Sequence, residues 1–310
     1  MALSGIGARL EDVAALLKEV FETPFTESVP RDNYMLQRIQ RGKADRDVIQ
    51  WKVHYAGNQS AGSYAETDEA PDAGMQSYIE AEVPIRQNWV IYGTTGLAEA
   101  ATRSRDGAYF QTLASEAKEA LEDLKNELNR QILAMTKAKP TDIDGIGVIV
   151  SDTGTYAGID RATHPWWRSY VNRSDNGDPR PLQLHMMFDV LEELEKMERR
   201  AKVSAIFTTR AHYNDYYYLL SEQRRYVNTM KLDGGVEALE FNSIPVIPVL
   251  GMAHGNMFFL DESEWSYRVL ENFETVPLPV NGDAQKFFTK HYSQLVCKHP
   301  GRQGLITDLQ

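Results

Sequence analysis

The longest regular pattern of apolar and polar positions in the chain covers residues 108–139, between Gly107 and Pro140. Apolar residues recur there at intervals of three and four, which places them on one face of an α-helix. They are Phe110, Leu113, Ala114, Ala117, Ala120, Leu121, Leu124, Leu128, Ile132 and Met135. At a rise of 1.5 Å per residue the predicted helix would be about 48 Å long. A helix so long, with a single apolar face, is typical of a spine along which other elements pack.

A second pattern, the strict alternation of apolar and polar residues, occurs in residues 47–55 and again in residues 79–86. Such runs predict β-strands, and we interpret the two as the legs of one long hairpin. The connecting residues 56–77 are rich in Gly, Ala, Ser and acidic side chains. Unstructured connections longer than about 12–15 residues are uncommon in compact domains. Two interpretations remain open: an exposed surface loop, or a loop whose partner is another copy of the protein.

The segments that flank this hairpin carry weaker patterns. Residues 10–21 predict a short amphipathic helix that Pro24 ends, and residues 23–46 read as polar and irregular. Residues 93–106 predict a short helical connector to the spine. An N-terminal arm of this kind often packs against a neighbour.

The second half of the chain mixes helices with strands and turns. Residues 143–150, 203–208 and 256–260 predict strands, while residues 184–194 and 210–223 predict helices. Residues 239–250 read as extended, but Pro245 and Pro248 should confine them to a sheet edge or to irregular structure. Residues 291–298 and 305–309 predict a closing hairpin. Segregated helices and antiparallel hairpins together indicate the α+β class.

Composition restricts the function. The 310 residues are 42% hydrophobic and carry a net charge of −11, which disfavours a protein that grips nucleic acid through its phosphates. A single cysteine, Cys297, excludes an internal disulfide framework and a cysteine-based zinc site. No apolar run reaches the 18 or more residues that span a bilayer, and Arg9, Glu11 and Asp12 interrupt any secretory signal. We therefore expect a soluble protein made in a cytoplasm.

A search for catalytic motifs finds none that is complete. The Gly57–Gly62 stretch has one residue too many for a nucleophile elbow, and Gly145-Ile-Gly147 lacks the third glycine of a dinucleotide fingerprint. The seven histidines are scattered; His212 and Asp215 would share a helix face, where a hydrogen bond is a better explanation than a metal site. We expect no catalytic, cofactor-binding or metal-binding residue.

The aromatic and basic residues Trp166, Trp167 and Arg168 offer flat surfaces that stack on a base or a sugar in other proteins. Few basic residues accompany them, so a structural role is the better interpretation. The same segment carries a resemblance. Residues 158–168 read Gly-Ile-Asp-Arg-Ala-Thr-His-Pro-Trp-Trp-Arg and resemble a Gly-Ile-Asp/Ser-Arg-x-Thr-x-x-x-Trp-Arg signature of tailed-phage major capsid proteins.

The resemblance extends from about residue 31 to the C-terminus, because further segments follow in the family's usual order. They are Leu128-Asn-Arg-Gln131, residues 208–220, Arg224-Arg-Tyr226, Phe241-Asn-Ser-Ile-Pro-Val246 and Phe258-Phe-Leu-Asp261. No segment is specific alone, but the ordered set is. The chain is thus similar to capsid proteins with the phage Hong Kong 97 fold.

That resemblance implies an α+β fold of four parts. They are an N-terminal arm (residues 1–46), an extended hairpin loop (47–90), a peripheral domain with the spine helix (91–140 and 249–310) and an axial domain (141–248). It also implies a structural protein, not an enzyme, and no cofactor. Such a protein self-assembles into pentamers and hexamers of an icosahedral head. The head encloses double-stranded DNA without sequence-specific binding and without a membrane.

The implied location is the virion capsid, assembled in the host bacterial cytoplasm. The implied partners are portal and decoration proteins and, because the arm is short, a separate scaffolding protein. Residues expected at contacts between subunits are Asn58, Tyr64, Glu66, Asp68, Glu69, Arg161, Trp166, Trp167 and Arg168. The alternatives are an encapsulin-like or gene-transfer-agent shell protein and, from a different class, a cytosolic hydrolase.

Overall fold

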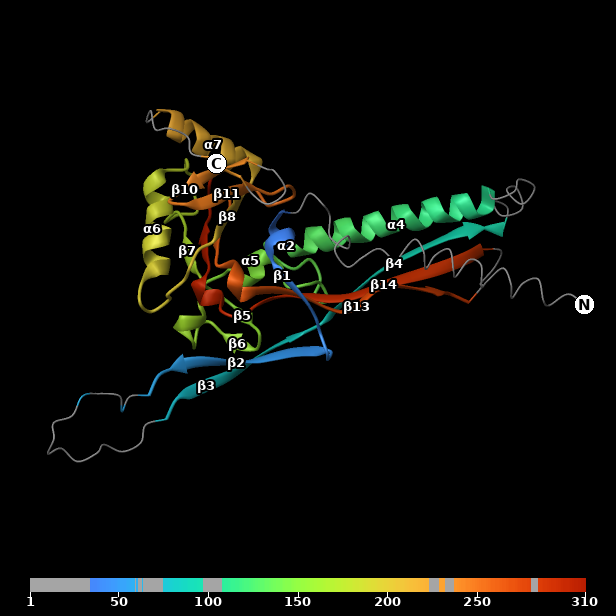
Figure 1. Ribbon diagram of the computed structural model, residues 1–310, viewed down its shortest axis with the longest axis horizontal. Coiled ribbons are helices and arrows are strands. Elements are labelled where there is room, and N and C mark those ends of the chain that lie inside the picture. Colours follow the sequence, from blue (N-terminus) through green and yellow to red (C-terminus); the bar gives the residue numbers. More distant parts are fainter. Residues whose placement is uncertain are drawn as a thin grey trace, which may run out of the picture.

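The computed structural model describes residues 34–58, 60, 63, 75–96, 108–222, 229–231, 237–279 and 284–310. The predicted helix at residues 10–21, most of the long loop and most of the connector lie outside these residues. The described chain is elongated and is built around two separate sheets (Figure 1). Between 34 and 43, where the sequence predicts irregular structure, the chain forms helix α2 (Tyr34–Arg38) and strand β1 (Gln40–Lys43), so that prediction is wrong.

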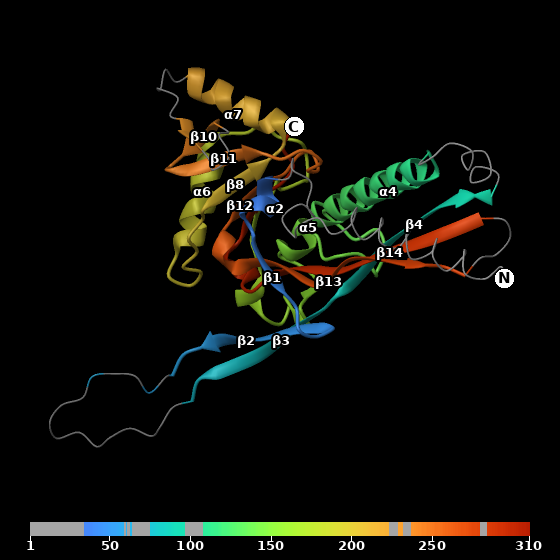
Figure 2. The same cartoon turned by 45° about the vertical axis from the view of Figure 1, so that its right-hand side comes forward.

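A four-stranded sheet supports the spine helix. Its strand order is β1, β13 (Trp265–Pro277), β14 (Ala284–Cys297) and β4 (Arg86–Thr95). The β13, β14 and β4 strands are antiparallel, and β1 runs parallel to β13. Helix α4 (Ala108–Ile132) lies along one side of this sheet (Figures 1 and 2). Its predicted apolar face is confirmed by the burial of Leu113, Ala117, Ala120, Leu121, Leu124, Leu128 and Ile132.

The spine helix ends at Ile132, seven residues before the predicted end. Its 25 residues give a length of about 38 Å. Beyond the helix, the backbone at residues 134–135 contacts the backbone at Gly147: the Gly147 amide donates to the Ala134 carbonyl at 3.2 Å. A Cβ on Gly147 would lie 2.4 Å from the Met135 Cα, so only glycine permits this crossing. The predicted strand at 143–150 is instead the short helix α5 (Ile146–Ile149), because a short apolar run does not distinguish the two structures.

The second sheet has seven strands. In order they are β7 (Tyr170–Asn172), β15 (Gly304–Ile306), β12 (Met257–Leu260), β8 (Ala205–Thr208), β11 (Ile244–Pro248), β10 (Glu237–Phe241) and β9 (Thr229–Lys231). Helix α6 (Leu184–Glu195) packs near β7 and β15, and α7 (Arg210–Glu222) packs near β11. Both helices and the strands β8 and β12 confirm their predictions.

The seven-stranded sheet separates two hydrophobic cores. Successive residues of its central strands face opposite ways: Phe258 belongs to the core beneath α4, whereas Phe259 belongs to the core beneath α6. Ile206 and Phe207 on β8 divide in the same manner. Strands buried on both faces read as continuous apolar runs, as β12 does.

Strand β11 corrects the expectation that its prolines confine it to an edge. It lies between β8 and β10. Asn242 and Ser243, with φ of 50° and 65°, make the two-residue turn from β10 to β11, and Pro245 is opposite Glu240, one step from the turn. At this position the Pro245 nitrogen, which carries no hydrogen, faces away from β10, and pairing with β8 begins only at Val246. The proline therefore costs the sheet no hydrogen bond.

The closing hairpin is also a wrong prediction, because its two strands lie in different sheets. Strand β14 pairs with β13, while β15 pairs with β12 and β7 after the turn η4 (Pro300–Arg302). Strands β12 and β15, which follow residue 249, lie in the seven-stranded sheet, whereas β13 and β14 lie in the sheet beside the spine helix.

The predicted long hairpin is confirmed. Strand β2 (Val48–Ala56) pairs antiparallel with β3 (Ser77–Pro84), from Val48 opposite Pro84 to Ala56 opposite Ser77. Figures 1 and 2 show this two-stranded ribbon leaving the body and pointing away from the spine helix. Among the described helices, none is long and apolar enough to cross a membrane.

Candidate subunit-contact site

The segment that carries the sequence signature folds into a tight platform beside the base of the hairpin. Strands β5 (Thr155–Tyr156) and β6 (Ile159–Asp160) form a small hairpin whose turn residues, Ala157 and Gly158, have φ of 53° and 76°. Two positive φ values in a two-residue turn suit the right-handed twist of the strands. The Ala157 carbonyl accepts the Glu82 amide of β3 at 3.1 Å, which joins the platform to the long hairpin.

Arg161 is the internal clamp of the platform. Its side chain is 1% exposed, and its guanidinium donates to the carbonyls of Thr153 at 2.8 Å, Ile149 at 2.6 Å and Val148 at 3.2 Å. Two of these acceptors lie at the C-terminal end of α5, where a positive charge is favourable. Burial lowers the pKa of Arg161, although an arginine keeps its charge in proteins. The signature arginine thus fixes the backbone of residues 148–153.

Tyr156 and Trp167 attach the platform to strand β14. The Tyr156 hydroxyl accepts the Cys297 amide at 2.9 Å and lies 3.3 Å from the Cys297 carbonyl, and burial raises its pKa well above the usual value. Trp167, in the turn η2 (Pro165–Trp167), is fully buried and donates its indole N–H to the Tyr156 carbonyl at 3.1 Å. The two rings stack with centroids 6.2 Å apart. This contact sets the position of the platform on the body.

Two neighbouring residues face outward. Arg168 donates to the carbonyls of Arg161 at 2.6 Å and Ala162 at 3.0 Å, which closes the turn between β6 and η2. Trp166 is half-buried, and its ring stacks on Tyr55 of β2 with centroids 5.4 Å apart and planes 7° apart. Trp51 of the same strand donates its indole N–H to the Lys298 carbonyl at 3.2 Å. The hairpin is therefore held to the body by aromatic side chains of β2.

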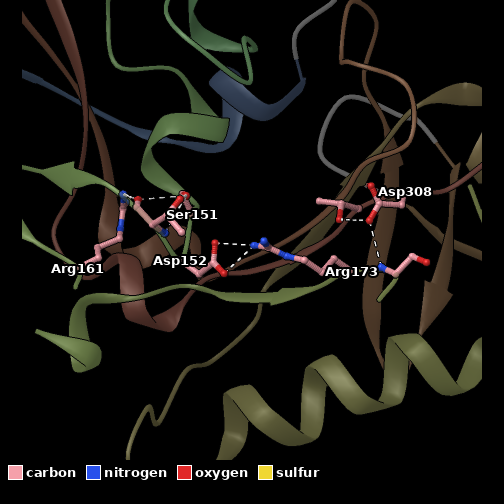
Figure 3. Close-up of polar contacts among 8 residues, drawn as sticks. Ser151, Asp152, Arg161, Arg173 and Asp308 are labelled. Atoms are coloured by element: carbon pink, nitrogen blue, oxygen red, sulfur yellow. Dashed lines mark hydrogen bonds and ion pairs between the residues drawn. The ribbon is translucent and has the colours of Figure 1, made fainter. Parts of the chain in front are cut away.

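A polar chain continues from the platform toward the C-terminus. Figure 3 shows Arg173, just after β7, reaching Asp152 of the platform, with both carboxylate oxygens 2.6 Å from Nη2. Asp308 accepts the Ser174 amide at 3.1 Å. The Arg173–Asp152 pair is solvent-exposed, so it contributes little stability. The pair links the loop after β7 to the platform.

The predicted contact residues divide into three groups. Arg161 and Trp167 are buried within their own chain, where their side chains hold the platform together. Asn58, which accepts the Ser60 amide at 2.8 Å, is exposed, and Trp166 and Arg168 are half-exposed. Tyr64, Glu66, Asp68 and Glu69 lie outside the described residues.

The residue pair that sequence reasoning missed is Tyr55 with Trp166. Tyr55 belongs to an alternating strand and Trp166 to the signature, but their contact joins segments more than 100 residues apart. The signal that the sequence offered for this pair was Tyr55, an aromatic residue near the outer end of β2. Long-range ring contacts of this kind leave no local pattern.

The described residues contain no group of three or more His, Cys, Asp or Glu side chains placed to hold a metal ion. His212 makes internal hydrogen bonds instead: Nδ1 lies 3.3 Å from an Asp215 carboxylate oxygen, and Nε2 accepts the Gly255 amide at 3.1 Å. Burial lowers the pKa of His212. A structural role for this histidine agrees with the sequence interpretation.

Comparison with solved structures identifies the fold as that of a viral capsid subunit of the phage Hong Kong 97 type. The chain is similar to a subunit of the cyanophage A-1(L) capsid, with a TM-score of 0.66 and 18% identity over 89% of this chain and 91% of that one. It is similar to the capsid protein of a native gene-transfer-agent particle, with a TM-score of 0.62 and 11% identity over 93% and 95%.

A third similar structure is the encapsulin SrpI of Synechococcus elongatus, in a holo complex, with a TM-score of 0.58 and 9% identity over 100% of this chain and 97% of that one. No curated protein sequence matches the chain. The family model of the SU10 major capsid protein matches residues 20–310. The chain belongs to this family. It is a structural protein of a capsid shell, not an enzyme.

Proposed function

We propose that this subunit forms the icosahedral head of a tailed phage by assembling into pentamers and hexamers around double-stranded DNA. The observation that carries the proposal is the β2–β3 ribbon, whose outer end projects from the body (Figure 1). Isolated two-stranded ribbons are marginally stable in water. Near its outer end Tyr78 and Met75 are 56% and 86% exposed, which favours a neighbouring subunit as the missing partner.

The other parts of the chain fit this arrangement as proposals. Residues 1–46 form the arm, the spine helix and the four-stranded sheet form the peripheral domain, and the seven-stranded sheet with α6 and α7 forms the axial domain. Strand β4 pairs with β14 from Arg86 onward, so we place the end of the extended loop at Ile85 and not at residue 90. Asn58, Tyr64, Glu66, Asp68 and Glu69 are then contact residues of the loop, and Trp166 and Arg168 are contact residues of the platform.

A net charge of −11 suits a container for DNA, since a shell must enclose the polyanion without binding it tightly. Assembly in the bacterial cytoplasm, a scaffolding protein, a portal and decoration proteins complete the proposal. Co-expression of the subunit with its genomic neighbours tests these partners, because a scaffold would change the size or the closure of the particles that form.

Removal of the loop tests the role of the ribbon. Deletion of residues 58–73 should leave a folded, soluble subunit that closes no shells, because only the outer part of the hairpin is lost. A matched control removes Asp175 and Asn176, which lie in a turn near Gly177, far from the hairpin. Electron microscopy would count shells in both preparations. Normal shells from the loop deletion would contradict the assignment.

A nanocompartment or a gene-transfer agent is the second candidate, and its support is the similarity of fold to SrpI and to the gene-transfer-agent capsid over nearly the whole chain. Portal, terminase and tail genes beside the gene for this chain would favour a phage or a transfer agent. A neighbouring cargo enzyme that copurifies within the particles would favour a nanocompartment.

A further inference from the structure

The outer part of the long hairpin is strongly acidic. No lysine or arginine occurs from residue 53 to residue 79, and four acidic residues do. All four lie within residues 66–72: Glu66, Asp68, Glu69 and Asp72. Like charges this close repel one another, so the segment is favoured next to a surface of positive charge.

The base of the same hairpin is basic. Between the end of β1 and the start of β2 lies a cavity of about 290 Å³, lined by Lys43, Ala44, Asp45, Arg46, Val48, Ile49, Gln50 and Arg268. Three of these side chains are cationic and one is acidic. Within the described part of the chain, Lys43 and Arg46 are exposed and make no ion pair. We call this cavity the basic pocket.

Gly42 leaves the space that the Arg268 side chain occupies at the edge of the pocket. Arg268 of β13 is paired with Gly42 of β1, and a Cβ at Gly42 would lie 2.5 Å from Arg268 Nη1. The guanidinium therefore lies across the bare backbone of β1, and its Nε contacts the Ser266 hydroxyl at 3.4 Å. A planar arginine held in this way presents donors that match a carboxylate.

The two oppositely charged segments belong to the same hairpin. The nine residues of β2 carry the hairpin about 30 Å away from the basic pocket, and the acidic segment follows β2 in the sequence. A second copy placed head to tail brings the acidic end of one hairpin to the basic base of the next. A contact that joins different patches on each copy repeats around a ring and closes it when the rotation permits.

We propose that the basic pocket binds the acidic segment 66–72 of a neighbouring copy of this chain. The proposal rests on the proposed function as a shell subunit and adds the site that receives the loop. Each exposed ion pair is weak alone, but the contact recurs at every subunit, and complementary charge fixes the register and speeds encounter. The contact therefore weakens as salt rises.

Charge reversal tests the pairing. The double variant K43E/R46E should keep the melting temperature of the subunit and reduce closed shells by at least about tenfold at 0.15 M salt, because repulsion replaces attraction. The control K118E/K202E makes the same change in net charge at two exposed lysines away from the pocket. Shells at the wild-type yield from K43E/R46E would overturn the pocket while leaving the shell function intact.

Exchange of the charges is the stricter test. Adding E66K, D68K and E69K to the K43E/R46E variant should restore shells, since the segment then carries a net charge of +2 and the altered pocket one of −2. If this quintuple variant forms none, the pairing is overturned. If the unaltered chain forms no shells under any condition, the proposed function itself fails, which separates the two outcomes.

Cross-linking reports the contact directly. The native Cys297 is buried, so new surface cysteines are readily distinguished. In assembled particles of Q50C/A70C, mild oxidation should produce a ladder of disulfide-linked oligomers, up to the number of subunits in one ring. A reductant should abolish this ladder. Each single variant should give none. Intact particles of the double variant without a ladder would overturn the proposal.

Discussion

At the scale of single residues, buried polar side chains replace apolar packing at several points of this fold. His291 lies on the covered face of the four-stranded sheet, where its ring stacks on Phe273 with centroids 4.5 Å apart. Its Nε2 lies 3.1 Å from the Tyr267 hydroxyl, and Nδ1 has no hydrogen-bond partner in the described chain. Burial lowers the pKa of His291 to about 4 and raises that of Tyr267 to about 12. Tyr267 is therefore neutral at all ordinary pH values.

His291 should make the subunit sensitive to acid. Its pKa is 6.5 when the chain is unfolded and about 4 when it is folded, so the unfolded state binds more protons within this window. Stability should fall as the pH drops through the window, by up to about 3 kcal/mol from this group. Urea titrations from pH 7 to pH 4 would measure the slope. The variant H291Q should flatten it, and an unchanged slope would contradict the assignment.

Arg161 should be a large contributor to stability. Truncation by R161A would remove three hydrogen bonds and leave the buried Ile149 carbonyl without this donor, at a cost of about 3 kcal/mol in the free energy of unfolding. R161K keeps the charge but loses the planar set of donors, so its free energy of unfolding should lie between those of the unaltered chain and R161A. Denaturant unfolding of R161A and R161K would measure the loss of stability. The control is R200A, which alters an exposed arginine. Equal stability of R161A and R200A would exclude the clamp.

At the scale of elements, the spine helix and the long hairpin differ in how they are held. The spine helix buries an entire face against its own sheet, whereas the hairpin buries only a few side chains, among them Val53, Ala81 and Val83. Secondary structure with few buried contacts opens locally at low cost. The hairpin is therefore the element whose orientation a neighbour is best able to set.

A break in the spine helix should prevent folding. In L124P the proline removes a helical hydrogen bond and displaces a side chain that is 3% exposed, at a cost of about 3 kcal/mol or more. Circular dichroism and thermal melting would show the loss of a cooperative transition. The exposed neighbour Glu122 provides the control E122A, which should melt normally. A cooperatively melting L124P protein would count against the spine.

Loss of the Tyr55–Trp166 stack should loosen the hairpin without unfolding the body. A stacked aromatic pair contributes about 0.5–1.5 kcal/mol beyond its buried area. In W166A, amide hydrogen exchange should accelerate in β2 and β3 and remain unchanged in α4. The control W89A removes an exposed tryptophan of β4 and should leave β2 protected. Unchanged exchange in W166A would show that other contacts hold the hairpin.

Sequence patterns predicted the elements whose periodicity is local. The spine helix, α6, α7 and the β2–β3 hairpin follow from regular spacing of apolar residues. Strand β13 was missed because Arg268, Glu271 and Glu274 interrupt its pattern, and register shifts occur on both sides of Glu271. The path of β14 and β15 into different sheets depends on long-range pairing, which leaves no trace in adjacent residues.

At the scale of the whole molecule, the seven-stranded sheet separates two cores, and one end of an elongated body carries an extended ribbon. The signature at 158–168 predicted the capsid fold, but it could not predict that Arg161 and Trp167 serve the interior. A signature residue is constrained equally by internal packing and by contact with a partner. Only the fold distinguishes the two roles.

The basic pocket was equally hidden from the sequence. Lys43 and Arg46 stand in a stretch of mixed charge, and Arg268 lies more than 200 residues away. The parallel pairing of β1 with β13 brings them together. A charged surface assembled by sheet pairing is a property of the folded molecule.

The most direct test of the shell function is negative-stain electron microscopy of the overexpressed chain, alone and together with its genomic neighbours. Closed shells, tubes, sheets or discrete rings of five and six subunits are the predicted result. Uniform small particles under every condition, including the presence of a candidate scaffold, would contradict it.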